Sequence, residues 1–116
     1  METSLAVTAL AALAQEHRLA VFRLLVQAGP DGMPAGQVAE ALHLAPNTLT
    51  FHFDRLRIAG LVTQRRDGRS VIYAAQFDRM NALLGFLTEN CCAGATNKCA
   101  PAICAPVKTK RSKVAA

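Results

Sequence analysis

The fold is decided by the stretch LAPNTLTFHFDRLRIAGLV, residues 44–62. Pro46 suits the first turn of a helix, because the N–H group that proline lacks would have no partner there. Gly60 suits the position just past a helix end, since glycine adopts the left-handed backbone conformation easily. Between them, apolar residues at helical spacing predict a helix over residues 46–59. Its apolar face consists of Leu49, Phe53 and Leu56.

The other side of this helix is polar and aromatic. It carries Asn47, Thr50, Phe51, Asp54 and Arg55. Residues 35–42 precede it as a short helix, and residues 43–46 make a tight connection between the two. A short helix, a tight turn and a second helix with a polar outer face is the helix-turn-helix organisation.

Two further helices are expected upstream. Residues 5–14 and 15–27 show apolar positions at helical spacing, and Gly29 with Pro30 ends the second helix. The expected apolar positions are Leu5, Thr8, Ala9, Ala12 and Leu13 in the first helix and Leu19, Phe22, Leu25 and Val26 in the second. Residues 31–34 then form a turn, because they combine Asp, Gly and Pro.

A β-hairpin and one more helix follow. Residues 61–66 and 70–75 have the character of strands, and Asp67-Gly68 between them favours a tight type I′ turn. Residues 76–89 have the spacing of a last helix. The predicted fold is mainly α with a small β-hairpin, a winged helix-turn-helix of about five helices plus a two-stranded wing.

The overall composition indicates one small domain with an anionic partner. A chain of 116 residues has room for one modest core. Its formal net charge of +5 favours nucleic acid as the partner. We expect a folded domain over residues 1–92 and a flexible, cysteine-containing basic tail over residues 93–116.

Several functional classes are disfavoured by what the sequence lacks. The longest apolar stretch, residues 5–14, is too short to span a bilayer, and no Lys or Arg precedes it as in a signal peptide. There is no Gly-rich phosphate loop, no Ser-His-Asp arrangement and no cluster of catalytic carboxylates. We therefore expect a cytoplasmic protein that is not an enzyme, needs no organic cofactor and binds no membrane.

The polar side of the helix over residues 46–59 has the side chains that DNA readers use. A recognition helix lies in the major groove with its N-terminal residues at the base edges. Asn47 can bond adenine through two hydrogen bonds, while Thr48, Thr50 and Phe51 can touch a thymine methyl group. Arg55, one turn later, suits a phosphate or a guanine.

Some residues of this helix have a purely structural alternative. Asn47 is also a common turn or capping residue, and Phe51 could instead join the core. His52 lies toward the apolar side, so we expect a packed histidine rather than a base reader. Asp54 would repel phosphates, and we expect it to pair with Arg57 within the helix.

Three arginines lie at the tip of the expected hairpin, Arg65, Arg66 and Arg69. At the tip of a wing they would contact the phosphate backbone or enter the minor groove. Such contacts make DNA binding dependent on salt. The alternative is that they are only solvated.

Four cysteines lie near the end of the chain: Cys91, Cys92, Cys99 and Cys104. In the cytoplasm thiols stay reduced and available to metals. Three converging thiolates suit As(III) or Sb(III), whose trigonal pyramidal geometry leaves a lone pair at the apex. The same thiolates could serve zinc, cadmium or copper, or form a disulfide in an oxidation sensor.

Three segments, taken in order, resemble the ArsR/SmtB family of metalloregulators. They are residues 13–25, 44–62 and 66–73, and the resemblance covers about residues 5–92. It implies a homodimeric winged-helix repressor whose first and last helices form the dimer interface. Two recognition helices would then meet double-stranded operator DNA about one helical turn apart.

The family's usual arsenic site is a Cys-Val-Cys type motif in the DNA-binding helices, and those helices contain no cysteine here. The segment TENCC at residues 88–92, followed by a further cysteine, instead resembles a smaller group of arsenic-responsive members. These carry a three-cysteine As(III) site at the end of the last helix. The resemblance implies As(III) as the inducer and an arsenic-resistance operon as the target. The implied ligands are Cys91, Cys92 and Cys99, with Cys104 as a rival or auxiliary third ligand.

Overall fold

The computed structural model describes residues 1–94. Residues Met1–Leu83 form one compact unit, and a second unit begins at Leu84. The helices are α1 (Thr3–Leu13), α2 (Glu16–Ala28), α3 (Ala35–Leu42), α4 (Pro46–Ile58) and α5 (Phe77–Leu87), followed by the short 3-10 helix η1 (Cys91–Gly94). The strands are β1 (Met33–Pro34), β2 (Val62–Asp67) and β3 (Ser70–Ala75). The predicted winged helix-turn-helix is thereby confirmed.

The wing has one strand more than predicted. β1 pairs with β3, so the antiparallel sheet has three strands in the order β1-β3-β2. The expectation that residues 31–34 form only a turn is therefore wrong for Met33 and Pro34. Gly32 allows this pairing because its φ is +77° and a Cβ there would clash with the Tyr73 carbonyl oxygen.

The hairpin turn lies one residue later than predicted. Asp67 still pairs with Ser70, so the two loop residues are Gly68 and Arg69. Only Gly68 has a positive φ, +63°. A single positive φ at the first loop position is typical of a type II′ turn, whereas the predicted type I′ turn needs two.

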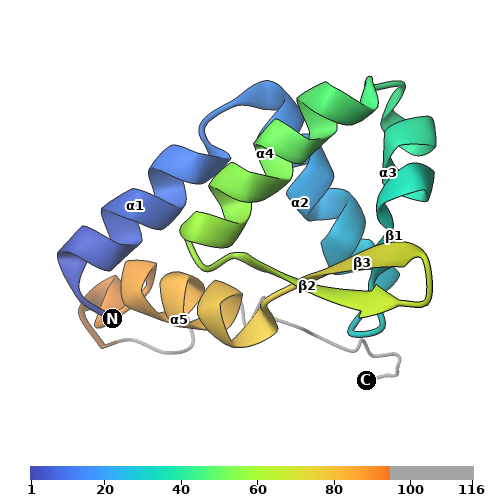
Figure 1. The fold of residues 1–116 in the computed structure, drawn as a ribbon. Helices are drawn as coiled ribbons and strands as arrows, with labels where there is room; N and C mark the ends of the chain where they lie inside the picture. Colours follow the sequence, from blue (N-terminus) through green and yellow to red (C-terminus); the bar gives the residue numbers. More distant parts are fainter. Residues whose placement is uncertain (95–116) are drawn as a thin grey trace. The chain divides into compact units, whose positions relative to one another are not determined.

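The core of the first unit is built around α4. Its predicted apolar residues, Leu49, Phe53 and Leu56, are all at most 2% exposed. α4 packs against α2 and α3 (Figure 1), and Val21, Leu25 and Val38 are also fully buried. α4 begins at Pro46 without a side-chain cap, and His43, which follows the last residue of α3, has the left-handed conformation. This tight connection fixes the direction of α4.

The buried sides of α1 and α2 differ in part from the prediction. α1 buries Ala6, Ala9 and Ala12, while the expected core residue Leu5 is 43% exposed. Alanine side chains are short, so α1 can lie close to its neighbours on this face. Leu19 of α2, also expected in the core, is 44% exposed, because α2 turns Val21, Phe22 and Leu25 inward.

The last helix is shorter than the predicted range of residues 76–89. It ends at Leu87, where the hydroxyl of Thr88 donates to the carbonyl oxygen of Leu84. Asn90 then has a positive φ of 56°, which ends helical continuation before η1. Most of the predicted basic tail, from residue 95 on, lies outside the described residues.

Candidate nucleic-acid interface

The outer face of α4 presents the side chains that the sequence predicts for DNA reading. Asn47, Thr48, Thr50, Phe51 and Arg55 are all exposed, while Leu49, Phe53 and Leu56 are buried on the other side. The alternative of Phe51 as a core residue is wrong, since its ring is 51% exposed. The structure thus brings the five predicted α4 residues together on one surface.

Hydrogen bonding and stacking restrain two of these residues. The Thr50 hydroxyl donates to the Pro46 carbonyl oxygen at 2.9 Å, which fixes its rotamer. The Arg55 guanidinium lies 5.1 Å from the centre of the Phe51 ring. This cation–π contact holds the arginine over the aromatic ring and leaves its N–H groups for another partner.

Asp54 has the role that the sequence predicts for it. One of its carboxylate oxygens lies 3.5 Å from an Arg57 nitrogen, within α4. Both side chains are about half exposed, so the pair adds little to stability. Its effect is to neutralise the one carboxylate on α4.

His52 is the packed histidine that the sequence predicts. It is 6% exposed, and its ring centre lies 5.7 Å from that of His17 in α2. Its Nδ1 has no hydrogen-bond partner in the described part of the chain. Burial lowers the pKa of His52, and the positive charges of Arg18 and His17 lower it further.

Acidification is therefore expected to destabilise the protein through His52. Its folded pKa lies below the ordinary value of 6.5, so the unfolded chain binds more protons as the pH falls through that value. The free energy of unfolding should fall from about pH 7 downward, until the folded pKa is passed. One histidine contributes at most about 1.4 kcal/mol per pH unit.

Urea unfolding at about pH 7.5 and about pH 5.5 measures this effect. In His52→Gln the loss of stability between the two pH values should shrink. His43→Asn is the matched control, because His43 is exposed and asparagine also adopts the left-handed conformation found there. An equal loss in wild type and His52→Gln would show that another group causes it.

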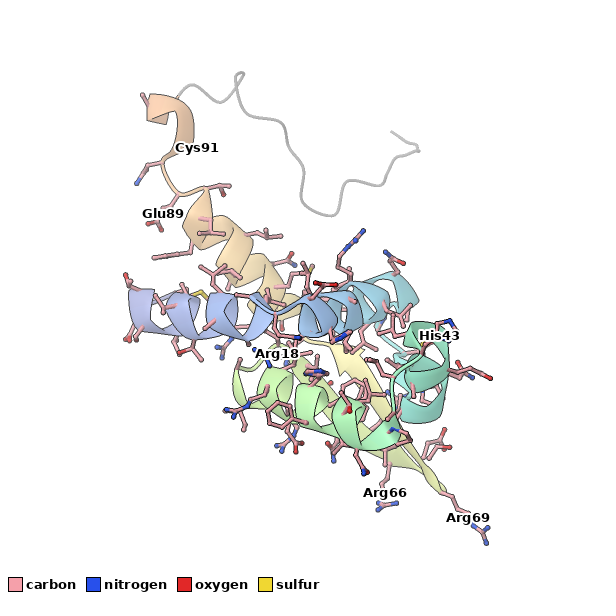
Figure 2. All side chains as sticks on the ribbon, turned by 90° about the horizontal axis from the view of Figure 1, so that it is seen from above. Arg18, His43, Arg66, Arg69, Glu89 and Cys91 are labelled. Atoms are coloured by element: carbon pink, nitrogen blue, oxygen red, sulfur yellow. The ribbon has the colours of Figure 1, made fainter. Side chains whose placement is uncertain are left out.

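The wing does not hold its three arginines together. Arg66 and Arg69 project from the tip, away from the helices (Figure 2). Arg65 instead donates from Nη2 to the carbonyl oxygen of Asp31 at 2.9 Å. Arg65 and Arg66 are neighbours in one strand, so their side chains leave opposite faces of the sheet.

Sequence reasoning missed Arg18, whose side chain lies where α1, α2 and α4 meet. Its Nε donates to the carbonyl oxygen of Ala12 at 2.6 Å. The only sequence signal was a cation close to the break between two apolar helices. The same reasoning could not foresee the Arg65–Asp31 bond, whose partners are 34 positions apart.

The structure covers only the beginning of the predicted cysteine site. Cys91 is half-buried and starts η1, directly followed by Cys92. Cys99 and Cys104 lie outside the described residues. Within residues 1–94, no three His, Cys, Asp or Glu side chains are arranged to hold a metal ion.

No single helix of the described chain is long and apolar enough to cross a membrane. Only α1 and α2 together pass that test, by length and composition, and they are bent by 101° at the break between them.

The sequence and fold of the chain are similar to those of known proteins. Residues 13–65 match the model of a helix-turn-helix domain family. The chain is 36% identical over 77 residues to YceK of Bacillus subtilis, named an uncharacterised HTH-type transcriptional regulator; the match covers 66% of this chain and 76% of that protein.

Among solved structures, HlyU from Vibrio cholerae has a TM-score of 0.60 at 30% identity, covering 75% of this chain and 97% of that one. A homodimeric winged helix-turn-helix DNA-binding domain from Mycobacterium bovis, described as a possible ArsR-family regulator, has a TM-score of 0.60 at 26% identity. It covers 75% of this chain and 81% of that one.

Proposed function

Since the chain belongs to the ArsR/SmtB-like winged helix-turn-helix transcriptional regulators, we propose that it is a homodimeric repressor released from its operator by As(III). In this proposal α4 reads the operator, the wing contacts the DNA backbone, and C-terminal thiolates bind the inducer. Sb(III), which has the same geometry, is expected to act likewise.

The observation that carries the DNA-binding half is the exposed face of α4. Asn47, Thr48 and Thr50 lie in its first turns, where a recognition helix meets base edges. Asn47 suits adenine, and the threonine methyl groups suit thymine. Arg55 over Phe51 lies one turn further, where a phosphate contact is expected.

The dimer is proposed from the relatives. The related domain from Mycobacterium bovis is homodimeric. Two copies of α4 would meet a palindromic operator about one helical turn apart. We expect α1 and α5 to form the interface between the two copies.

The arsenite half rests on the order of the thiols in the sequence. The arrangement is Cys-Cys-x6-Cys-x4-Cys, and its first member begins η1 just after α5. Adjacent cysteines can both reach one ion, and the short loop to Cys99 costs little entropy to close. The ion releases DNA only if it binds the DNA-free conformation better than the DNA-bound one.

Fluorescence anisotropy with the reduced full chain tests the proposal. The DNA is the duplex upstream of its own gene, with a scrambled duplex as the control. We expect tighter binding to the first duplex and weaker binding after addition of arsenite. Equal affinity for both duplexes would overturn the DNA-reading role of α4. Release by zinc, cadmium or peroxide but not by arsenite would replace As(III) with another inducer.

The wing arginines should control the salt dependence of DNA binding. Each phosphate contact contributes about 0.9 to the slope of log affinity against log salt concentration. The dimer brings two wings to the DNA, so replacing both Arg66 and Arg69 by alanine removes four contacts and should lower that slope by roughly 3.6. The preference for the promoter duplex should change little, because phosphate contacts carry no sequence information.

The control for the wing variant is Arg23→Ala, which removes an exposed arginine from α2. Its slope should equal that of the wild type. A slope that falls equally in both variants would mean that only net charge matters and that the wing makes no specific contact.

A further inference from the structure

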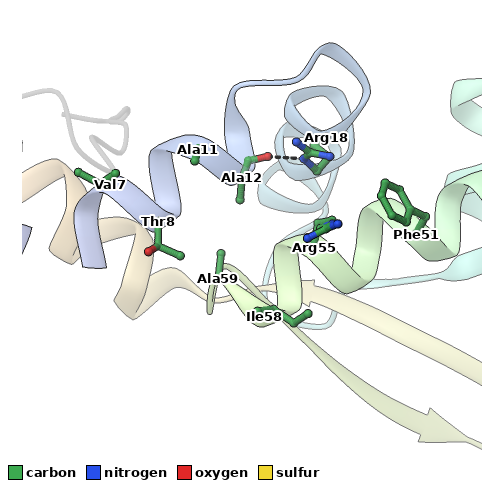
Figure 3. A pocket seen from close by; sticks show the side chains of 9 residues that line it. All are labelled: Val7, Thr8, Ala11, Ala12, Arg18, Phe51, Arg55, Ile58 and Ala59. Atoms are coloured by element: carbon green, nitrogen blue, oxygen red, sulfur yellow. Dashed lines mark hydrogen bonds between the residues drawn. The ribbon is translucent and has the colours of Figure 1, made fainter. Parts of the chain in front are cut away.

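A cavity of about 510 Å³ lies between α1 and α4, next to the start of α2 (Figure 3). All of its lining residues belong to the unit Met1–Leu83. Its volume falls within the range of small-molecule sites in proteins. Its wall includes the core residues Ala12 and Ala59, and no cysteine lines it.

Two guanidinium groups line this cavity, those of Arg18 and Arg55. Arg18 donates one hydrogen bond, from Nε to the Ala12 carbonyl oxygen. Its two terminal nitrogens have no partner within residues 1–94. Within residues 1–94 the one ion pair joins Arg57 to Asp54. No carboxylate of these residues therefore pairs with Arg18 or Arg55. None of the lining residues is acidic.

The electrostatic surroundings are positive as well. The charge of Arg18 contributes to lowering the pKa of the neighbouring His52. An anion bound in the cavity would make charge-assisted hydrogen bonds to the two guanidinium groups.

The rest of the cavity wall is apolar. Val7 is 56% exposed and Ile58 is 73% exposed, so both aliphatic side chains offer apolar surface to a ligand. Figure 3 shows Val7 at one end of the cavity and the two arginines further along it, with Ile58 next to Arg55 and Phe51 beyond the arginines. The site therefore has a cationic part formed by the two arginines and an apolar part that includes Val7 and Ile58.

We propose that this cavity binds a small organic carboxylate with an apolar body. The carboxylate bonds Arg18 and Arg55, and the hydrocarbon covers Val7, Ala11 and Ile58. Inorganic phosphate satisfies only the cationic end, and a neutral hydrocarbon leaves both arginines unpaired.

Binding at this site has a consequence that rests on the proposed function. Arg55 and Phe51 belong both to the cavity wall and to the DNA-reading face of α4. A carboxylate that holds Arg55 withdraws it from a phosphate. The ligand is therefore expected to weaken DNA binding without using the cysteines.

The test is titration calorimetry of the full chain without DNA. Octanoate is the probe, acetate supplies the charge alone, and 1-octanol supplies the apolar chain alone. We expect octanoate to bind at least about tenfold more tightly than either, because only it fills both ends. Equal affinity for octanoate and acetate, or for octanoate and octanol, would overturn the proposal.

Matched variants locate the site. Arg55→Gln should weaken octanoate binding about tenfold or more, while Arg66→Gln removes the same charge at the wing and should leave it unchanged. Ala11→Phe fills the cavity from an exposed position on α1 and should block octanoate. Equal weakening by Arg55→Gln and Arg66→Gln would mean that the anion responds only to net charge.

Amide NMR shifts of the wild-type chain give an assignment that does not depend on any variant. Octanoate should shift the amides of Val7, Ala11 and Ala59 more than those of the wing. Shifts spread over the whole chain would overturn the proposal. A protein that binds octanoate but no DNA would refute the proposed function and support this site. A protein that binds DNA but no octanoate would refute this site and leave the proposed function standing.

Discussion

Replacing Phe53 by alanine is expected to lower the free energy of unfolding by about 3–5 kcal/mol. Phe53 is 1% exposed and stacks on Tyr73, with ring centres 3.5 Å apart and planes 6° from parallel. The contact joins the recognition helix α4 to the central strand of the sheet. A domain of this size has about 5–15 kcal/mol of stability in total, so this variant should be largely unfolded at moderate urea concentrations.

The neighbouring aromatic residue supplies the control. Phe51 lies two positions earlier in α4 and is half exposed, so Phe51→Ala should cost less than about 1 kcal/mol. We expect Phe51→Ala to weaken DNA binding instead. Urea unfolding followed by circular dichroism, at one fixed protein concentration, compares the two variants. Similar losses would mean that α4 is rotated relative to the described orientation.

The response to arsenite should disappear when Cys91 and Cys92 are both replaced by serine. In the wild type, As(III) should weaken operator binding roughly 5–150-fold, the usual range of allosteric coupling. Serine retains the size of cysteine but offers no soft thiolate, so the variant should bind DNA with unchanged affinity at every arsenite concentration. Anisotropy titrations of both proteins, kept reduced, measure the difference.

Single serine variants of the other two cysteines identify the third ligand. Cys99→Ser should lose most of the response, while Cys104→Ser should keep it, because Cys99 closes the shorter loop from the adjacent pair. The reverse result would make Cys104 the ligand. If arsenite still released DNA from the Cys91→Ser/Cys92→Ser protein, the proposed thiolate site would be refuted.

The recognition helix was predictable because its information is local. The spacing of Leu49, Phe53 and Leu56 gives the buried side, and Pro46 gives the beginning. The exposed residues Asn47 and Thr50 follow from the same spacing. Even the Asp54–Arg57 pair is a contact between neighbouring turns of one helix.

The features that were missed depend on contacts between distant parts of the chain. Met33 and Pro34 are too few to show the alternation of a strand, and they become one only by pairing with Tyr73 and Ile72. Leu19 looks like a core residue in its own helix, but which side is buried depends on the neighbouring elements. The predicted turn was one position too early, because Asp67 suits either a loop or the end of a strand and here pairs with Ser70.

The same limit applies to the cavity between α1 and α4. Its apolar wall combines exposed residues from α1 and α4, for example Val7 and Ile58, which are 51 positions apart in the sequence. Neither helix alone shows a site. Arg18 and Arg55 become a pair only when α2 and α4 pack together, which no periodic pattern in the sequence encodes.

The hydrogen bond from Arg65 to Asp31 restrains the wing relative to the helices. It joins the hairpin to the loop after α2, the helix against which α4 packs. This bond restrains the separation between the residues proposed to read bases and the arginines at the wing tip. Each base pair advances DNA by about 3.4 Å, so an operator lengthened between the two contacts cannot engage both. We therefore expect the proposed regulator to be sensitive to the length of its half-site as well as to its sequence.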